Sequence, residues 1–96
     1  MILTERQTDR GLLVTVCDSD VLGETFEDGE VSLEVTEDFY GGDRVAEEAV
    51  IDSLSRASVA NLVGTEVVEL AIEEGFVDED RILEIDTTLH AQYLRF

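Results

Sequence analysis

Acidic residues recur along the entire chain, and this distribution limits how the chain can fold. Asp and Glu account for 24 of the 96 residues, against six arginines and no lysine, which gives a net charge of -18. A disordered acidic tail would be poor in apolar residues, whereas 44% of this chain is hydrophobic. We therefore expect the carboxylates to form a solvated surface around an ordinary apolar core.

This surface charge indicates the solvent in which the protein works. In dilute buffer such a surface repels itself and destabilises the compact state. At molar salt the Debye length falls to about 3 Å and the repulsion is largely screened. We interpret the chain as an acidic protein from the cytoplasm of an extreme halophile. The alternative is an acidic mesophilic protein, such as a nucleic-acid mimic or inhibitor.

The net charge does not decide whether the partner is a nucleic acid. A strongly acidic protein is normally a poor binder of RNA or DNA, because phosphate neutralisation dominates such binding. In molar salt both the repulsion and the gain from counterion release shrink. Binding would then depend on stacking and specific contacts.

The sequence predicts one soluble domain over residues 1–96, without a membrane segment. There is no proline-rich linker or internal repeat, and no apolar run approaches the roughly 20 residues that a membrane helix needs. Cys17 is the only cysteine, so we expect no internal disulfide and no thiolate zinc site. No motif for a cofactor is present, and we expect none to be bound.

The hydrophobic pattern predicts an α+β fold, with a small mixed or antiparallel sheet of about four to five strands packed with two helices. Residues 18–29 are expected to be a polar loop, and residues 58–63 fit either a short strand or a buried turn. Strands are predicted at residues 1–7, 12–17, 31–36, 82–85 and 90–96.

Two helices are predicted between these strands. The first has an apolar stripe from Val45 to Ala57, and Asp43 is its expected N-cap. The second begins at Thr65, which can cap it, and Gly75 is expected to end it in the left-handed conformation.

Three acid- or thiol-based sites are weak in this sequence, and we predict neither catalytic residues nor a specific metal site. The segment that starts at Asp18 opens like a calcium loop, but Leu22 and Gly29 stand where oxygen ligands are required. Paired carboxylates carry no information when one residue in four is acidic. Cys17 ends an apolar strand and His90 has no histidine or cysteine near it in sequence, so a nucleophile–base pair is not favoured.

The segment from Phe39 to Arg44 is one candidate binding site. Gly41 and Gly42 would enter a helix and expose backbone N–H groups to an anion. Tyr40 could stack on a base and Arg44 could contact a phosphate. The structural alternative is a tight strand-to-helix turn with Phe39 in the core.

Asn61 is the second candidate, because an asparagine inside the apolar run 60–64 is unusual. Its amide either fixes a turn that ends at Gly64 or faces a ligand. His90 is expected to be a structural or interface histidine.

Several short segments together resemble the archaeal domain-of-unknown-function family 424. They include Asp20-Val21-Leu22-Gly23, Phe39-Tyr40-Gly41-Gly42, Ala60-Asn61-Leu62-Val63-Gly64, Val68-Glu69-Leu70-Ala71 and His90-Ala91-Gln92. The resemblance covers essentially the whole chain. It implies a small α/β protein of the archaeal cytoplasm, with no established activity and a loose link to translation or ribosome-associated genes.

We therefore expect a non-enzymatic interaction module linked to translation, with RNA, a ribonucleoprotein or a protein as partner. The alternative is a small ligand-binding or enzymatic subunit with a pocket near Tyr40, Asn61 and His90. A third possibility is a homodimer formed through an exposed sheet edge. The predicted binding residues are Tyr40, Gly41, Gly42, Arg44, Asn61, Gly64 and His90.

Overall fold

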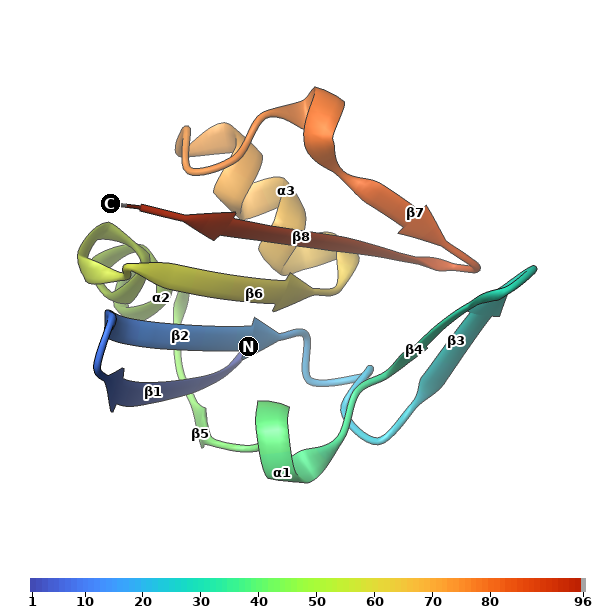
Figure 1. The fold of residues 1–96 in the computed structure, drawn as a ribbon, viewed down its shortest axis with the longest axis horizontal. Helices are drawn as coiled ribbons and strands as arrows, with labels where there is room; N and C mark the ends of the chain where they lie inside the picture. The colour runs from blue at the N-terminus through green and yellow to red at the C-terminus, as the bar shows by residue number, and fades with distance from the viewer. Residues whose placement is uncertain (96) are drawn as a thin grey trace.

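A computed structural model describes residues 1–95, which form eight strands, three α-helices and one turn of 3-10 helix (Figure 1). The elements in chain order are β1 (Ile2–Thr8), β2 (Gly11–Cys17), β3 (Thr25–Asp28), β4 (Val31–Glu34), α1 (Glu37–Tyr40), β5 (Asp43–Arg44), α2 (Glu47–Arg56), β6 (Val59–Val63), α3 (Thr65–Glu73), η1 (Glu79–Arg81), β7 (Leu83–Ile85) and β8 (Thr88–Leu94).

The strands of residues 1–95 form two sheets. A six-stranded sheet has the order β5-β1-β2-β6-β8-β7, and a hairpin of β3 and β4 forms the second sheet. The central β2–β6 pair is parallel and the other pairs are antiparallel. The α+β class is confirmed and the main sheet is mixed, but there are more strands and helices than the sequence predicted.

Three strands go beyond those predicted: β5, β6, which settles the segment 58–63 as a strand, and β3, which lies in the segment that we expected to be a polar loop. Residues Thr25–Asp28 form β3 and pair with β4 across a turn at Gly29, whose φ is 65°. Phe26 lies opposite Leu33 and is buried. The other β3 residues are exposed, so the strand carries a single apolar side chain and gives almost no alternation in sequence.

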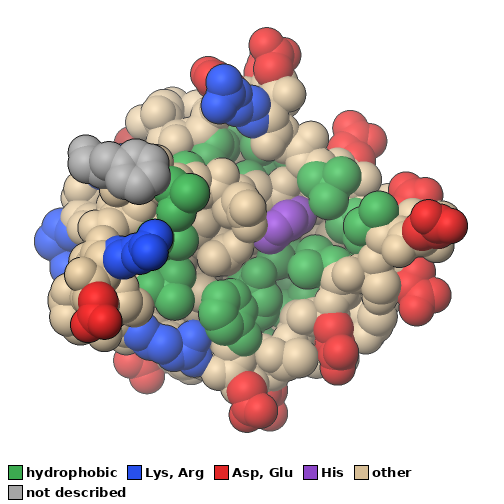
Figure 2. All heavy atoms as spheres, viewed as in Figure 1, with side chains coloured by type: hydrophobic (Ala, Val, Ile, Leu, Met, Phe, Trp, Pro, Cys, Tyr) green, Lys and Arg blue, Asp and Glu red, His purple; other side chains and the backbone are tan. Residues whose placement is uncertain are grey.

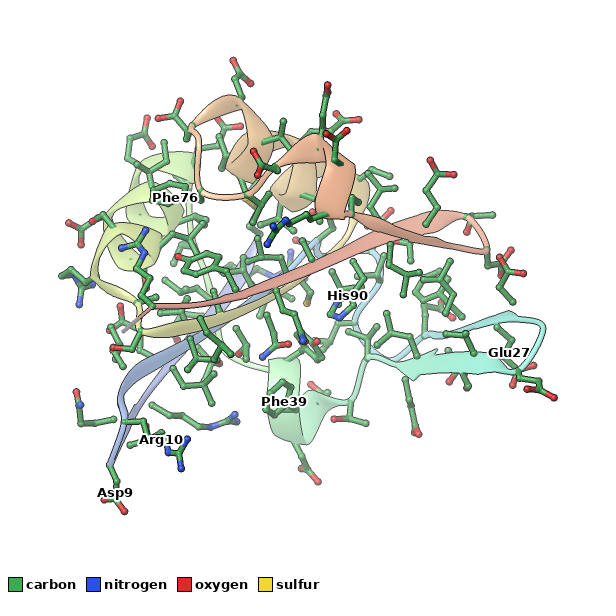
Figure 3. The ribbon with its side chains drawn as sticks, turned by 45° about the horizontal axis from the view of Figure 1, so that its top comes forward. Asp9, Arg10, Glu27, Phe39, Phe76 and His90 are labelled. Atoms are coloured by element: carbon green, nitrogen blue, oxygen red, sulfur yellow. The ribbon has the colours of Figure 1, made fainter. Side chains whose placement is uncertain are left out.

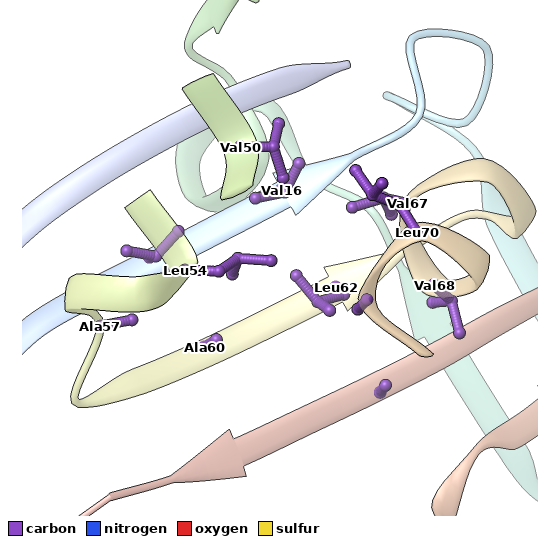
Figure 4. Close-up of a cluster of buried hydrophobic side chains, with 12 residues drawn as sticks. Val16, Val50, Leu54, Ala57, Ala60, Leu62, Val67, Val68 and Leu70 are labelled. Atoms are coloured by element: carbon purple, nitrogen blue, oxygen red, sulfur yellow. The ribbon is translucent and has the colours of Figure 1, made fainter. Parts of the chain in front are cut away.

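Helices α2 and α3 cover one face of the main sheet and form the larger core with it (Figure 4). Leu54 of α2 and Val67 of α3 are fully buried against Leu62 of β6 and its neighbours. Burial of a leucine or valine side chain stabilises a fold by about 1.5–3 kcal/mol. The apolar stripe predicted for α2 is confirmed for Val50, Leu54 and Ala57, which are buried in this core.

The predicted start of α2 is wrong. Asp43 is not an N-cap, because it pairs with Leu3 as part of β5. The helix begins at Glu47, and its N-cap Ala46 makes no side-chain hydrogen bond. Gly42 leaves no room for a Cβ atom beside the Leu3 carbonyl, so close strand pairing explains this glycine.

The predicted cap of α3 is also wrong, because Asp18 supplies it from the end of β2. The Asp18 carboxylate accepts hydrogen bonds from the N–H groups of Glu66 and Val67, both at 2.9 Å. Thr65 is the first helical residue, and Gly64 precedes it with a φ of 126°. A Cβ atom at Gly64 would collide with the Asp18 side chain. Burial raises the pKa of Asp18, because lost solvation outweighs these two donors.

The end of α3 follows the prediction. Gly75 has a φ of 81°, and the N–H of Phe76 donates to the carbonyl of Ala71, as in a left-handed helix terminus. The last strand, β8, starts at Thr88 rather than at residue 90, and Phe96 lies outside the described residues. Across residues 1–95, none of the helices has the length and apolarity to cross a bilayer.

Replacing Asp18, which caps α3 from a position distant in sequence, should destabilise the protein without altering its surface. We expect Asp18→Ala to lower the free energy of unfolding by about 1–2 kcal/mol, because two helix N–H groups lose their acceptor. Asp18→Asn should cost less, since one amide oxygen remains to accept. Denaturant unfolding in molar KCl measures both effects. The exposed neighbour Asp20→Ala is the control, and an equal loss in that variant would contradict the capping role.

Candidate functional site

The face of the main sheet opposite α2 and α3 carries three aligned rows of side chains. Strand register sets these rows, because residues that lie directly opposite each other share a face. The rows are Arg6-Leu13-Val59-Leu94, Thr4-Thr15-Asn61-Gln92 and Ile2-Cys17-Val63-His90-Leu83. None of these residues is acidic, although the chain has 24 acidic residues among 96.

Helix α1 and the β3–β4 hairpin cover one end of this face. Phe26 and Val35 from this covering layer form a second core with Cys17, Val63 and Ile85 of the sheet. Tyr40 of α1 belongs to the same cluster and is only 4% exposed. The third row is thus mostly buried, and α1 also covers the β1 and β2 members of the first two rows near Thr15, which is fully buried.

Three side chains of β1 and β2 fix α1 on the sheet. The hydroxyl of Thr15 donates to the Phe39 carbonyl at 3.1 Å, and that of Thr4 donates to the Gly41 carbonyl. The Arg6 guanidinium donates to the Asp38 carbonyl at 2.6 Å. Carbonyls at a helix end lack intrahelical partners, and these side chains supply their donors. Specific hydrogen bonds therefore hold α1 in place on the sheet.

Beyond the cover lies a surface that we name the open face. It consists of Leu13, Val59, Asn61, His90, Gln92 and Leu94. Gln92 is exposed, Leu94 is 63% exposed, and the other members are half-buried. Figure 2 shows the single histidine near the centre of this view, with hydrophobic side chains around it and carboxylates towards the rim.

Charge is divided unevenly around the open face. The segment from residue 18 to residue 38 holds nine acids and no arginine. Those acids are Asp18, Asp20, Glu24, Glu27, Asp28, Glu30, Glu34, Glu37 and Asp38. Figure 3 places Glu27 at the hairpin end and Arg10 at the opposite end of the molecule, with His90 between them. His90 of the open face therefore lies between the acidic hairpin and the end of the molecule that carries Arg10.

Of the predicted site residues, Asn61 and His90 come together on the open face. Asn61 lies opposite Gln92 and is the diagonal neighbour of His90, a spacing of about 7–8 Å in an antiparallel pair. His90 Nδ1 lies 2.9 Å from the Leu62 carbonyl and donates to it. The Asn61 side chain makes no hydrogen bond to another residue within 1–95, so its amide is available to a partner.

Neither Tyr40 nor Phe39 has the exposure that we expected. Tyr40 is buried, so its ring is not available to stack on a base, whereas Phe39 is 36% exposed rather than in the core. The two rings meet edge to face at 5.0 Å between centroids, and Arg6 lies 5.4 Å from the Phe39 ring centre.

The remaining predicted residues serve the fold. Gly41 follows α1 with an ordinary φ of -67°, and a Cβ atom there would meet the Glu37 carbonyl. Arg44 lies on β5, four strands from β8, or about 19 Å at normal strand spacing. Gly64 gives space to Asp18. The predicted set therefore does not converge on one pocket.

Cys17 and His90 share a row but do not form a reactive pair. Val63 lies between them, so their strands are about 10 Å apart. Cys17 is fully buried, and burial, followed by the charge of Asp18, raises the pKa of its thiol to about 11. Among the described residues, no group of His, Cys, Asp or Glu side chains has the geometry to hold a metal ion.

Most of the open face was not predicted from the sequence, namely Leu13, Val59, Gln92 and Leu94. The signal that was available is parity within strands. Residues 14 and 16 face the helices, so residue 13 faces away from them. Asn61 likewise shares a face with Val59.

Alkaline pH should destabilise this covered core. Burial raises the pKa of Tyr40 to about 12 and that of Cys17 to about 11, from ordinary values of 10.0 and 9.0. Both groups hold their protons more tightly when folded. Their contribution is thus present below about pH 9 and is lost as the pH rises through about 11–12.

Tyr40→Phe tests this dependence. Between about pH 9 and pH 12 the free energy of unfolding should fall in the wild type, with about 2 kcal/mol of the loss due to Tyr40. The variant should show a correspondingly smaller fall in denaturant titrations in molar KCl. Parallel pH curves for the two proteins would contradict the assignment.

Comparison with known proteins gives a family and a fold. The family model described as "Protein of unknown function (DUF424)" matches residues 5–96. The structure is similar to the crystal structure of an uncharacterized conserved protein from Methanopyrus kandleri, with a TM-score of 0.79 and 21% identity, over 99% of this chain and 92% of that chain. This likeness shows a shared fold alone. No curated protein matches the chain. The family expected from the motifs is confirmed, and the chain belongs to the DUF424 family.

Proposed function

We propose that this protein is a non-enzymatic interaction module linked to translation, which binds an RNA or ribonucleoprotein partner on the open face. The observation that carries the proposal is the absence of acids from the solvent-accessible residues of the open face, in a chain where one residue in four is acidic. A surface shaped only by solvent would carry acids on this face as well.

The chemistry of the open face supports a partner with unpaired bases. Asn61 and Gln92 are direct neighbours across β6 and β8, and side-chain amides can each make two hydrogen bonds to a base edge. Leu13, Val59 and Leu94 supply apolar area beside them. Specific contacts of this kind keep their strength in molar salt, where attraction to phosphates is screened.

The proposal also agrees with the charge of the rest of the surface. The acids surround the open face and suit a protein of the archaeal cytoplasm at high salt. A pocket built from Tyr40, Asn61 and His90 is not favoured, because Tyr40 is buried under the cover.

Capture from lysate kept in molar KCl tests the proposal. We expect the wild-type protein to recover RNA together with ribosomal proteins. Leu94→Glu should reduce the recovered RNA about tenfold, which corresponds to about 1.4 kcal/mol, because it places a carboxylate among the neutral side chains.

Val31→Glu is the matched control. Val31 is also a strongly exposed apolar residue, at 48%, but lies on the hairpin. The Val31→Glu variant should recover as much RNA as the wild type. Recovery of neither RNA nor ribosomal proteins by the wild type, or equal losses in both variants, would argue against the proposal.

Asn61→Val separates function from stability. Valine favours strands more than asparagine does and lies well beside Val59 and Val63, so the free energy of unfolding should rise by about 0.5–1 kcal/mol. RNA recovery should fall, because an amide is lost from the open face. A variant that is less stable and still recovers RNA normally would show that Asn61 has only a structural role.

A further inference from the structure

The C-terminal part of strand β8, beyond its pairing with β7, has an unpaired outer edge. The N–H of Arg95 donates to Ser58 at 2.7 Å, and the N–H of Gly64 donates to Leu89 at 2.9 Å. Peptide groups alternate in direction along a strand, so those of Gln92 and Leu94 point away from β6. On that outer side the β7 ladder ends where Leu83 pairs with His90. Within residues 1–95, Gln92 and Leu94 therefore have no strand partner at this edge.

A groove runs beside this edge. It has a volume of about 480 Å³ and is lined by Val59, Asn61, Phe76, Val77, Asp78, Arg81, Gln92, Tyr93 and Leu94. Phe76 and Val77 come from the segment after α3, and Arg81 comes from η1. The groove thus occupies the position that β7 would fill if it continued along β8, and it combines free peptide groups with an apolar wall.

The charge of the groove is unusual for this protein. Asp78 is the one carboxylate among its lining residues, and Arg81 faces the same space. Arg95 borders the groove, since its guanidinium lies 5.9 Å from the Phe76 ring centre and 5.1 Å from that of Tyr93. Neither arginine has a carboxylate within salt-bridge distance among residues 1–95, although acids outnumber arginines 24 to six.

We propose that the outer edge of β8 binds an extended segment of a partner protein in which apolar and acidic residues alternate. The segment adds a strand beside Gln92 and Leu94, and backbone hydrogen bonds to this edge supply much of the affinity. Its apolar side chains lie against Phe76 and Val77, and its carboxylates, which alternate with them and point to the other side of the strand, pair with Arg81.

The geometry favours such a segment over a second copy of this chain. The free edge is short, because β7 pairs with β8 up to His90, and residues of the segment from Phe76 to Arg81 line the groove beside it. A short extended peptide fits this space, whereas a second folded sheet would have to bring its own β7 and η1 into it. A second copy also adds a charge of -18 to the complex.

The test uses the whole protein and a synthetic peptide of about five residues, Val-Glu-Val-Glu-Val, which spans roughly 17 Å when extended. Binding is measured by fluorescence anisotropy in molar KCl and at lower salt. Two control peptides replace glutamate by lysine or N-methylate alternate amides. We expect saturable binding of the glutamate peptide, and a loss of at least about tenfold for the N-methylated one, which cannot complete the strand ladder.

Two variants of the protein localise the binding. Gln92→Pro removes an outward N–H that has no partner in the fold, a position at which an edge strand tolerates proline, and it should abolish binding. Arg81→Gln should weaken the glutamate peptide about fivefold and leave the lysine peptide unchanged or stronger. Because Arg81 is exposed, this second variant keeps the test valid if Gln92→Pro does not fold.

The proposal is overturned if the glutamate peptide does not bind the wild type, or if the N-methylated peptide binds equally well. Sedimentation of the wild type and of Gln92→Pro gives a further outcome. A dimer that the proline variant converts to monomer would assign this edge to a second copy and would also overturn the proposal. The groove shares Val59, Asn61, Gln92 and Leu94 with the open face, but peptide binding and sedimentation are measured without RNA, so these results do not depend on RNA recovery.

Discussion

The Asp18 carboxylate joins the two halves of the sheet, and the arrangement of the site depends on it. It follows β2 directly and caps α3, the helix that follows β6. The Asp18 N–H also donates to the Val63 carbonyl at 3.0 Å. These contacts hold the ends of the parallel strands β2 and β6 together, and they require Gly64 to lack a side chain. Among the acids of residues 1–95, Asp18 is buried, and its role is structural.

With β2 and β6 paired at the centre of the sheet, the two faces of the sheet differ in how far other elements cover them. Helices α2 and α3 pack on one face, and α1 with the hairpin covers only the end of the other. The uncovered part keeps amides and aliphatic side chains where most of the surface carries acids. The difference between the faces is therefore what gives an otherwise uniform acidic protein a candidate binding surface.

The main elements could be predicted because their apolar residues follow clear periods. The run 12–17 and the stripe of α2 are examples, and Gly75 ends α3 as expected. The hairpin and the cap could not be predicted, because both depend on contacts distant in sequence. Phe26 packs against the main sheet, and Asp18 is 48 residues from the N–H of Glu66. The spacing of neighbouring residues in the sequence does not indicate such contacts.

The candidate site was predicted in part for the same reason. Asn61 and His90 stand out chemically and do lie together, whereas Tyr40 was misplaced because α1 buries its ring. Leu13 and Gln92 are ordinary residues in sequence, and only the strand register places them beside Asn61. The amide pair on the open face is thus a product of the register rather than of any motif.

Backbone amide chemical shifts in molar KCl test the central claim most directly. The protein is titrated with a pool of short single-stranded RNAs of randomised sequence. The account predicts saturable shift changes at Leu13, Asn61 and Gln92, with α2, α3 and the hairpin tip unaffected. Changes confined to those helices or to the hairpin, or no saturable change at all, would contradict the claim that the acid-free face of the sheet binds the partner.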